Sequence, residues 1–256
     1  MILSLLFIFG LIIGSFLNVI ALRLLKEEGF IRGRSHCVFC QKILHWFELI
    51  PVISFLWQGG KCRGCQKNIP WRYILIEVIT GGLFAGVHYF LSNQNLQNFW
   101  PILIFNLIII SVLEVIFLID LKDGVIPDIL IWPFIALTLL FWWLSGGNIL
   151  NYFLTGLACT AFFGLQYLVS RGRWMGLGDI GLGFLIGVFL GFPRALAALL
   201  FAYISGAIIG IFLIILNKKN WASSVPLAVF LVPSAILALF WGEKVIRWYF
   251  DILGKM

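Results

Sequence analysis

The sequence has few charged residues and few cysteines. Lys, Arg, Asp and Glu make up 11% of its 256 residues, whereas an average soluble domain has about 25%. Hydrophobic residues account for 62%, and the mean hydropathy is +1.05. This composition excludes an ordinary soluble domain and a disordered chain. With 5 cysteines, the chain is also not a small protein held together by many disulfides.

The sequence contains long runs of uncharged residues. A helix needs roughly 20 apolar residues to cross the hydrocarbon core of a bilayer, and about eight such runs are present. We therefore predict an all-α polytopic membrane protein with about eight transmembrane helices and a long loop between the first and second. No nucleic-acid motif is visible, so we expect the lipid bilayer as a partner and not nucleic acid. The predicted spans are 1–22, 73–91, 101–119, 126–144, 150–169, 177–193, 195–216 and 224–242.

The first apolar run and the basic residues predict the orientation. Residues 1–22 have no basic residue before the run and no small-residue cleavage site after it, so we expect a retained membrane helix. Fourteen of the 18 Lys and Arg fall on one side of the predicted spans and four on the other. The positive-inside rule then places the N-terminus outside and the 23–72 loop in the cytosol. The fourteen are Arg23, Lys26, Arg32, Arg34, Lys42, Lys61, Arg63, Lys67, Arg72, Lys122, Arg171, Arg173, Lys218 and Lys219, and the four are Arg194, Lys244, Arg247 and Lys255.

Four cysteines in this loop form two pairs with metal-ligand spacing. Cys37 and Cys40 are followed, after 21 residues, by Cys62 and Cys65. Two such pairs can place four thiolates around one Zn²⁺, and an all-cysteine set leaves no open position, which is typical of structural zinc. Disulfides or a redox relay would require an oxidising compartment, and four unligated thiols are a further alternative. We expect the remaining cysteine, Cys159, to serve packing only.

Acidic residues at the cytosolic ends of predicted spans are candidates for catalysis. Asp120, Asp123 and Asp128 lie between the third and fourth spans, and Asp179 lies in a glycine-rich stretch that begins the sixth. Two carboxylates that share a site cannot both ionise easily, so one stays protonated while the other can activate water. The alternatives are that Asp128 or Asp179 caps a helix, or that Asp120 pairs with Lys122 or Arg171.

Two glutamates fall within predicted spans, where charge is costly. Glu77 is expected to pair with Arg72 or Lys67, with contact to a methyl-transfer region as the alternative. Glu114 lies six residues before Asp120, and we expect it to be a buried hydrogen-bonding residue.

The motifs, taken in order, resemble the type IV prepilin leader peptidases, which are bifunctional membrane aspartic proteases. The resemblance runs nearly end to end. It rests on Gly14-Ser-Phe-Leu-Asn-Val19 with Arg23, the cysteine pairs, Leu49-Ile-Pro-Val-Ile-Ser54, Ile69-Pro-Trp-Arg-Tyr73 with Glu77, Ile119-Asp120 through Pro127-Asp128, and Gly176-Leu-Gly-Asp179.

The resemblance implies a function and a set of site residues. Asp120 and Asp179 would be the catalytic pair, with Asp123, Asp128, Gly176 and Gly178 in supporting roles. The enzyme would cut type IV prepilins and type II secretion pseudopilins after a glycine, on the cytosolic face of the bacterial inner membrane. It would then methylate the new N-terminal residue with S-adenosyl-L-methionine.

The same resemblance divides the chain by expected activity. Residues 1–22 would be the first transmembrane helix, 23–72 the zinc loop associated with methyl transfer, and 73–256 the peptidase region. Departures from the family pattern, such as Trp57-Gln-Gly-Gly60 before Lys61, leave a peptidase without methylation as an alternative. An ion-coupled transporter and a zinc-loop scaffold that only recruits partners are the more distant ones. No glycine-rich turn of the Rossmann type is visible, so the sequence does not place the methyl donor.

Overall fold

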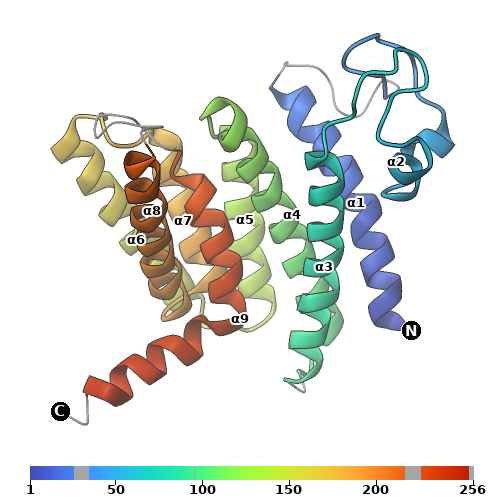
Figure 1. Cartoon of the computed structure of the whole chain (residues 1–256). Helices are drawn as coiled ribbons and strands as arrows, with labels where there is room; N and C mark the ends of the chain where they lie inside the picture. The colour runs from blue at the N-terminus through green and yellow to red at the C-terminus, as the bar shows by residue number, and fades with distance from the viewer. Residues whose placement is uncertain (26–34, 95, 217–225, 254–256) are drawn as a thin grey trace. The chain divides into compact units, whose positions relative to one another are not determined.

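The computed structural model describes residues 1–25, 35–94, 96–216 and 226–253, and its regular structure is almost entirely helical (Figure 1). Two isolated antiparallel bridges, His36 with Ile43 and Lys61 with Asn68, occur in the cysteine loop. Several residues of the charge argument lie outside the described residues, namely Lys26, Arg32, Arg34, Lys218, Lys219 and Lys255. The chain forms two compact units, residues 1–118 and 119–256, and one long helix, α4, continues from the first into the second.

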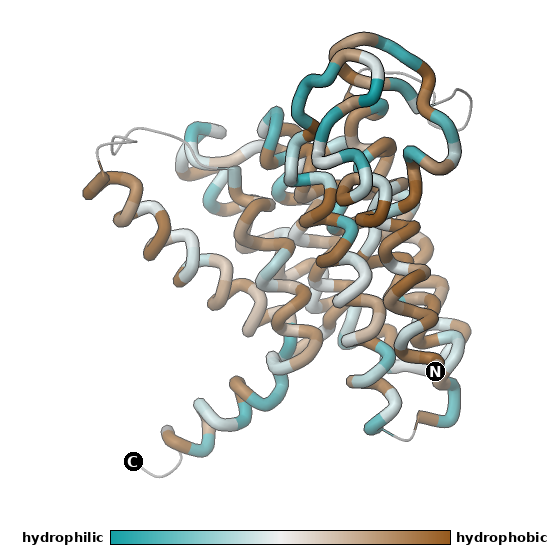
Figure 2. Tube along the Cα trace, turned by 45° about the vertical axis from the view of Figure 1, so that its right-hand side comes forward, coloured by the Kyte–Doolittle hydropathy of each residue, from teal (hydrophilic) through white to brown (hydrophobic). Residues whose placement is uncertain are grey.

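The first unit is built on two closely packed helices. α1 (Ile2–Leu24) and α3 (Arg72–Ser92) lie side by side, and the loop that joins them contains a 3₁₀ turn, η1 (Trp46–Leu49), and the short helix α2 (Ile53–Trp57). The first part of α4 (Phe99–Asp123) contacts α3, where the Thr80 hydroxyl donates to Glu114 Oε2 at 3.0 Å. Hydrophobic residues follow the helices and hydrophilic residues concentrate in the loop (Figure 2).

The second unit surrounds a buried central helix. α7 (Leu177–Leu190) contacts α5 (Asp128–Leu144), α6 (Ile149–Ser170), α8 (Arg194–Ile215) and α9 (Ala228–Leu253). Its side chains from Leu185 to Leu190 are all buried. Close approach to α6 depends on glycine, because a Cβ on Gly187 would lie 2.6 Å from the Gly156 Cα. This helix carries Asp179 in its first turn.

The helices agree with the predicted all-α membrane architecture. In the part of the chain that the structure describes, six helices are long and apolar enough to cross a bilayer, namely α1, α3, α4, α6, α8 and α9, while α5 and α7 are apolar but shorter. Three C-terminal ends differ from the predicted ones by three residues or more. α4 runs past 119 to Asp123, so that Asp120 and Asp123 lie on the helix. α7 stops at Leu190, not at 193, because Gly191 has a φ of +65°. α9 runs past 242 to Leu253. Glu243, in this additional part of the helix, pairs with Arg194 and Arg247.

Candidate metal centre and candidate active site

The two cysteine pairs form two turns of the same design. In the first turn Cys37 N–H donates to Lys42 O at 2.9 Å, and in the second Cys62 N–H donates to Lys67 O at 3.0 Å. Gln41 and Gln66 both have a φ of +58° and occupy matching positions. The repeat Cys-x-x-Cys-Gln-Lys, at 37–42 and 62–67, is the signal in the sequence that could have revealed this likeness.

The turns bring the four sulfurs together as a metal site requires. Cys37 Sγ lies 3.9 Å from Cys65 Sγ, and Cys40 Sγ lies 3.9 Å from Cys62 Sγ. All four ligand atoms lie within 4.8 Å of one another. In a tetrahedral site with Zn–S bonds of about 2.3 Å, neighbouring sulfurs are about 3.8 Å apart. The tetracysteine cluster can therefore bind a metal ion, and its dimensions match those of zinc.

Backbone donors around the cluster favour thiolates, which are the form that binds metal. Gly64 N–H lies 3.3 Å from Cys62 Sγ, and Phe39 N–H lies 3.5 Å from Cys37 Sγ. The N–H groups of Cys65 and Gly64 lower the pKa of Cys62 to about 7. The pKa of Cys40 is instead raised to about 11: the Lys42 N–H lowers it, but burial and the neighbouring thiols outweigh that effect. Before any ion is bound, the turns therefore favour the thiolate at Cys62 and not at Cys40.

The buried Glu48 carboxylate ties η1 to the first turn. It accepts hydrogen bonds from His45 N–H at 2.9 Å and from Lys42 Nζ at 3.5 Å. Burial raises the pKa of this carboxyl, but the His45 N–H and the Lys42 charge outweigh that effect and keep the pKa below its usual value. Lys42 and His45 thus hold Glu48 ionised and fix the segment between the two cysteine pairs.

In the second unit, Asp120 and Asp179 line one cavity. Asp120 lies near the end of α4 and is 3% exposed, and Asp179 lies in the first turn of α7 and is 8% exposed. The cavity has a volume of about 390 Å³, and its walls come from residues 124–126, 172–176 and 226–227 besides the two aspartates. Among the described residues that line it, none is Ser, Thr, Cys, His or Lys. The two carboxyls and Arg173 are the ionisable side chains of this described lining.

The two aspartates have different hydrogen-bond partners. Asp179 Oδ2 accepts from Gly176 N–H at 2.8 Å, at the N-terminus of α7, where a negative charge is favoured. The Asp120 carboxyl faces the N–H groups of Ala228 and Val229 at the start of α9. Its Oδ2 atom is buried and has no hydrogen-bond partner among the described residues. Asp120 thus has two backbone donors and one buried oxygen left over, whereas Asp179 has one backbone donor and no such buried oxygen.

The structure decides between the alternatives for these acids. Asp120 is not paired with Lys122, which lies 3.8 Å from Asp123 instead. Asp179 does help to cap its helix, but from the third helical position, and it also lines the cavity. Asp123 and Asp128 are exposed and do not line it. Asp128 is the first residue of α5 and not its cap, because Pro127 holds that position.

Gly176 and Gly178, the glycines beside Asp179, have unequal surroundings. A Cβ on Gly178 would lie 2.8 Å from Ile126 Cβ, so this glycine lets the loop after α4 approach α7. A Cβ on Gly176 would meet nothing closer than 3.7 Å. Gly178 is therefore the one on which the packing of the cavity wall depends.

The two glutamates of the first unit also find partners. Glu114 is buried and hydrogen-bonded to Thr80, as predicted. The predicted pairing of Glu77 with Arg72 or Lys67 is wrong. Its Oε2 atom instead accepts the N–H of Val52, just before α2, at 2.8 Å. Glu77 therefore holds the cysteine loop against α3. Cys159 is buried within α6.

This protein is an integral membrane protein with a candidate metal centre and a candidate acid–base site. Its class is defined by helices able to cross a bilayer, a tetracysteine loop and an acid-lined cavity. Comparison with known proteins then identifies its family. Residues 8–91 match the bacterial peptidase A24 N-terminal domain, and residues 107–211 match the type IV leader peptidase family. Among solved structures, none matches the chain.

Curated relatives extend this match over nearly the whole chain. The chain is 33% identical to a prepilin leader peptidase/N-methyltransferase of Bacillus subtilis, over 96% of this chain and 97% of the relative. It is 32% identical to the protein of that name from Aeromonas hydrophila, over 96% and 93%, and 30% identical to that from Legionella pneumophila, over 94% and 92%. The chain belongs to the type IV leader peptidase family.

Proposed function

We propose that this protein is a prepilin leader peptidase with N-methyltransferase activity, acting on type IV prepilins and type II secretion pseudopilins. The family match and the names of its relatives support this activity. One structural observation supports the assignment of residues. Asp120 and Asp179 are 59 positions apart in the sequence, yet they line one cavity whose described lining contains no other ionisable side chain apart from Arg173.

The different partners of the two carboxyls suggest their roles in peptide hydrolysis. Asp179, satisfied as a carboxylate at a helix N-terminus, takes a proton from water, and the water oxygen attacks the peptide carbonyl carbon. Asp120, protonated on the unpartnered Oδ2, donates to the carbonyl oxygen. Breakage of the C–N bond leaves a leader that ends in a carboxylate and a mature pilin with a free amine, which takes up a proton.

The methylation step follows at that amine. S-adenosyl-L-methionine, when bound, supplies an electrophilic methyl group. The deprotonated amine nitrogen forms a bond to the methyl carbon as the carbon–sulfur bond breaks, S-adenosylhomocysteine leaves, and the nitrogen then gives up a proton. Zn²⁺ on Cys37, Cys40, Cys62 and Cys65 would hold the loop together, because a closed all-cysteine site has no position for substrate.

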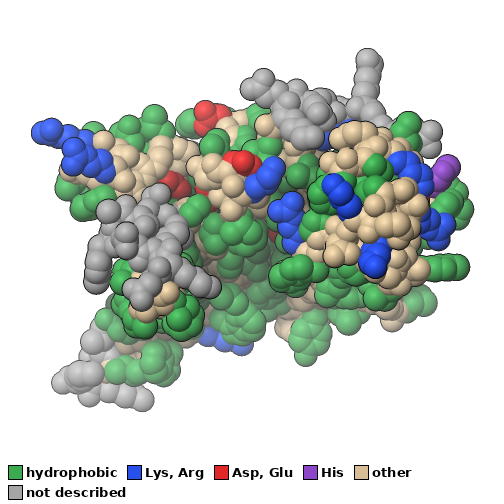
Figure 3. Space-filling view, turned by 45° about the horizontal axis from the view of Figure 1, so that its top comes forward, with side chains coloured by type: hydrophobic (Ala, Val, Ile, Leu, Met, Phe, Trp, Pro, Cys, Tyr) green, Lys and Arg blue, Asp and Glu red, His purple; other side chains and the backbone are tan. Residues whose placement is uncertain are grey.

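The charge distribution supports an orientation in the inner membrane. Lys and Arg side chains gather on the loop end of the molecule (Figure 3), where Lys61, Arg63 and Lys67 are exposed. Basic loops stay in the cytosol, so the cysteine loop would face the cytosol. In the second unit, Lys122, Arg171 and Arg173 lie in or beside the segments that line the aspartate cavity, and the same rule would place that cavity in the cytosol. The basic loop would then lie on the side where the leader is cut.

The test is mass spectrometry of a prepilin after incubation with the purified protein, with and without S-adenosyl-L-methionine. We expect cleavage after the leader glycine in both samples, and a gain of one methyl group only with the donor. Asp120→Asn and Asp179→Asn should each slow cleavage by at least about 100-fold.

The matched control is Asp251→Asn, which changes an exposed aspartate near the end of α9. It should cleave at the parental rate. Parental cleavage by either cavity variant would remove that residue from the site. Cleavage by the parent without any methyl gain would reduce the function to proteolysis.

A further inference from the structure

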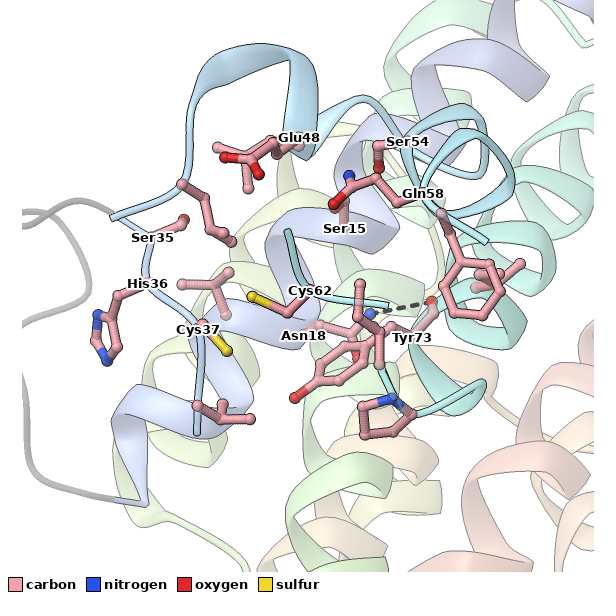
Figure 4. A pocket seen from close by; sticks show the side chains of 18 of the residues that line it. Ser15, Asn18, Ser35, His36, Cys37, Glu48, Ser54, Gln58, Cys62 and Tyr73 are labelled. Atoms are coloured by element: carbon pink, nitrogen blue, oxygen red, sulfur yellow. Dashed lines mark hydrogen bonds between the residues drawn. The ribbon is translucent and has the colours of Figure 1, made fainter. Parts of the chain in front are cut away.

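A second cavity lies within the first unit, beneath the cysteine loop. It has a volume of about 190 Å³ and is lined by α1, the loop and the start of α3. Figure 4 shows Ser15 near Gln58, and Asn18 hydrogen-bonded to the Tyr73 carbonyl oxygen at 3.4 Å. The sulfurs of Cys37 and Cys62 lie beside them, while the His36 ring points away. It shares no lining residue with the aspartate cavity.

The membrane side of this cavity is closed by direct helix packing. A Cβ on Gly14 would lie 2.8 Å from the Glu77 Cα, and one on Gly10 would lie 2.7 Å from the Gly81 Cα. At this separation no third helix fits between α1 and α3. A pilin helix therefore cannot enter the cavity through that seam. The opposite wall is formed by the loop, whose Ser35, Ser54 and Gln58 side chains are polar, which suits a ligand with polar groups.

One wall of the cavity carries a buried carboxylate without a cation. Glu77 is 7% exposed, and its partners are the Val52 N–H and the Ser15 hydroxyl. Among the described residues no Lys, Arg or His forms an ion pair with it. Burial of an ionised group is costly unless it is paired, so a ligand with positive charge would be stabilised here.

The remaining walls suit a flat aromatic group. Phe39, Phe55 and Tyr73 line the cavity, and the amides of Gln58 and Asn68 add donors and acceptors among them. Lys67 also lines it, with its Nζ 4.9 Å from the centre of the Phe39 ring, so Phe55 and Tyr73 are the rings that are free of this cation. Aromatic side chains stack on purine bases, and a largely apolar pocket with a few placed polar groups is typical of small-ligand sites.

We propose that this cavity binds S-adenosyl-L-methionine, with Glu77 facing the positive charge of the donor and the aromatic residues facing its adenine. This assignment rests on the proposed N-methyltransferase activity and adds the location of its donor. It also explains why the metal loop would matter for methylation. Cys37 and Cys62 are part of the cavity wall, so loss of the metal would open the donor site.

The first test measures binding to the zinc-loaded, full-length protein in lipid nanodiscs by titration calorimetry. The probes are S-adenosyl-L-methionine and S-adenosylhomocysteine. Glu77→Gln removes the charge but keeps an oxygen to accept the Val52 N–H, so the loop should stay in place and the zinc content should not change. We expect the Kd for S-adenosyl-L-methionine to rise at least tenfold.

The matched control is Glu114→Gln. It changes a glutamate that is equally buried and lies in the same unit but does not line the cavity. Its Kd should stay within twofold of the parent. Equal donor affinity in the parent and in Glu77→Gln would overturn the proposal.

The second test does not depend on any variant folding. Ultraviolet cross-linking of radiolabelled S-adenosyl-L-methionine to the parent protein, followed by peptide mapping, should place the label within residues 35–77. Label within 119–227 in a protein that methylates prepilin would overturn the location and leave the proposed function intact. A parent that cleaves prepilin but neither binds the donor nor methylates would overturn both.

Discussion

At the residue scale, the cysteines separate a metal-binding role from a packing role. Cys62 belongs to the cluster whose sulfurs lie within 4.8 Å of one another, whereas Cys159 is buried in α6. Cys62→Ser should remove a ligand and the stabilisation that metal binding gives to the loop. We expect its zinc content to fall from about one equivalent to near zero, as measured by plasma mass spectrometry, and methylation to fail before cleavage does.

Cys159→Ser is the matched control, because it makes the same chemical change away from the cluster. It should keep its zinc and cost no more than about 1–3 kcal/mol of stability through the buried hydroxyl. Full zinc content in Cys62→Ser, or full methylation without zinc, would contradict the assignment.

The glycines beside Asp179 offer a second comparison at this scale. Gly178→Ala places a methyl group 2.8 Å from Ile126 Cβ, whereas Gly176→Ala finds room. Overpacking of this kind typically costs about 1–3 kcal/mol, and it would shift the loop that lines the aspartate cavity. We expect Gly178→Ala to lower the rate of prepilin cleavage clearly more than Gly176→Ala, as followed by gel assay. Equal rates would show that the close approach is not needed.

At the element scale, the packing of α1 against α3 depends on glycines that touch backbone. Gly10→Val would force a side chain to within about 3 Å of the Gly81 backbone, which α3 can relieve only by moving away. We expect a loss of about 1–3 kcal/mol, seen as a lower Tm in detergent. The control is Gly82→Val in α3, where a Cβ meets nothing within 4 Å. The same Tm for both variants would contradict this account of the helix pair.

The ends of elements show how local sequence and tertiary contact share control. The end of the apolar run predicted α9 to stop near 242, but the helix continues to Leu253. In this last part Glu243 pairs with Arg194 of α8 and with Arg247 one turn on. Conversely, α7 ends early at a residue with positive φ. Neither the longer α9 nor the shorter α7 can be predicted from the apolar runs alone.

At the scale of the whole molecule, the orientation is the property to test. The charge count places the 145–148 loop outside and the 171–173 loop inside. Alkaline phosphatase fused after Asn148 should be active, because that enzyme folds in the periplasm, and a fusion after Gly172 should be inactive. Green fluorescent protein fused at the same two positions should give the opposite pattern. The reverse result at both positions would invert the proposed orientation.

The sequence by itself determined the helical membrane architecture and the metal-ligand set. Both depend on local features, namely apolar runs of membrane length and two cysteine pairs, each of which closes a tight turn within six residues. The cysteine pairs, together with the aspartate motifs and the other short motifs taken in order, were sufficient to indicate the family. The roles of Asp120 and Asp179 remain predictions until the variants are measured.

Only the tertiary structure decided which buried acid meets which partner. Glu77 accepts the N–H of Val52, which lies 25 positions away in the sequence. Asp120 faces the start of α9, which lies about 108 positions away. The cavity beneath the cysteine loop likewise arises where α1, α3 and the loop meet. Such contacts form when segments that are distant in the sequence pack together. A local pattern of residues does not indicate which distant segments will pack against each other.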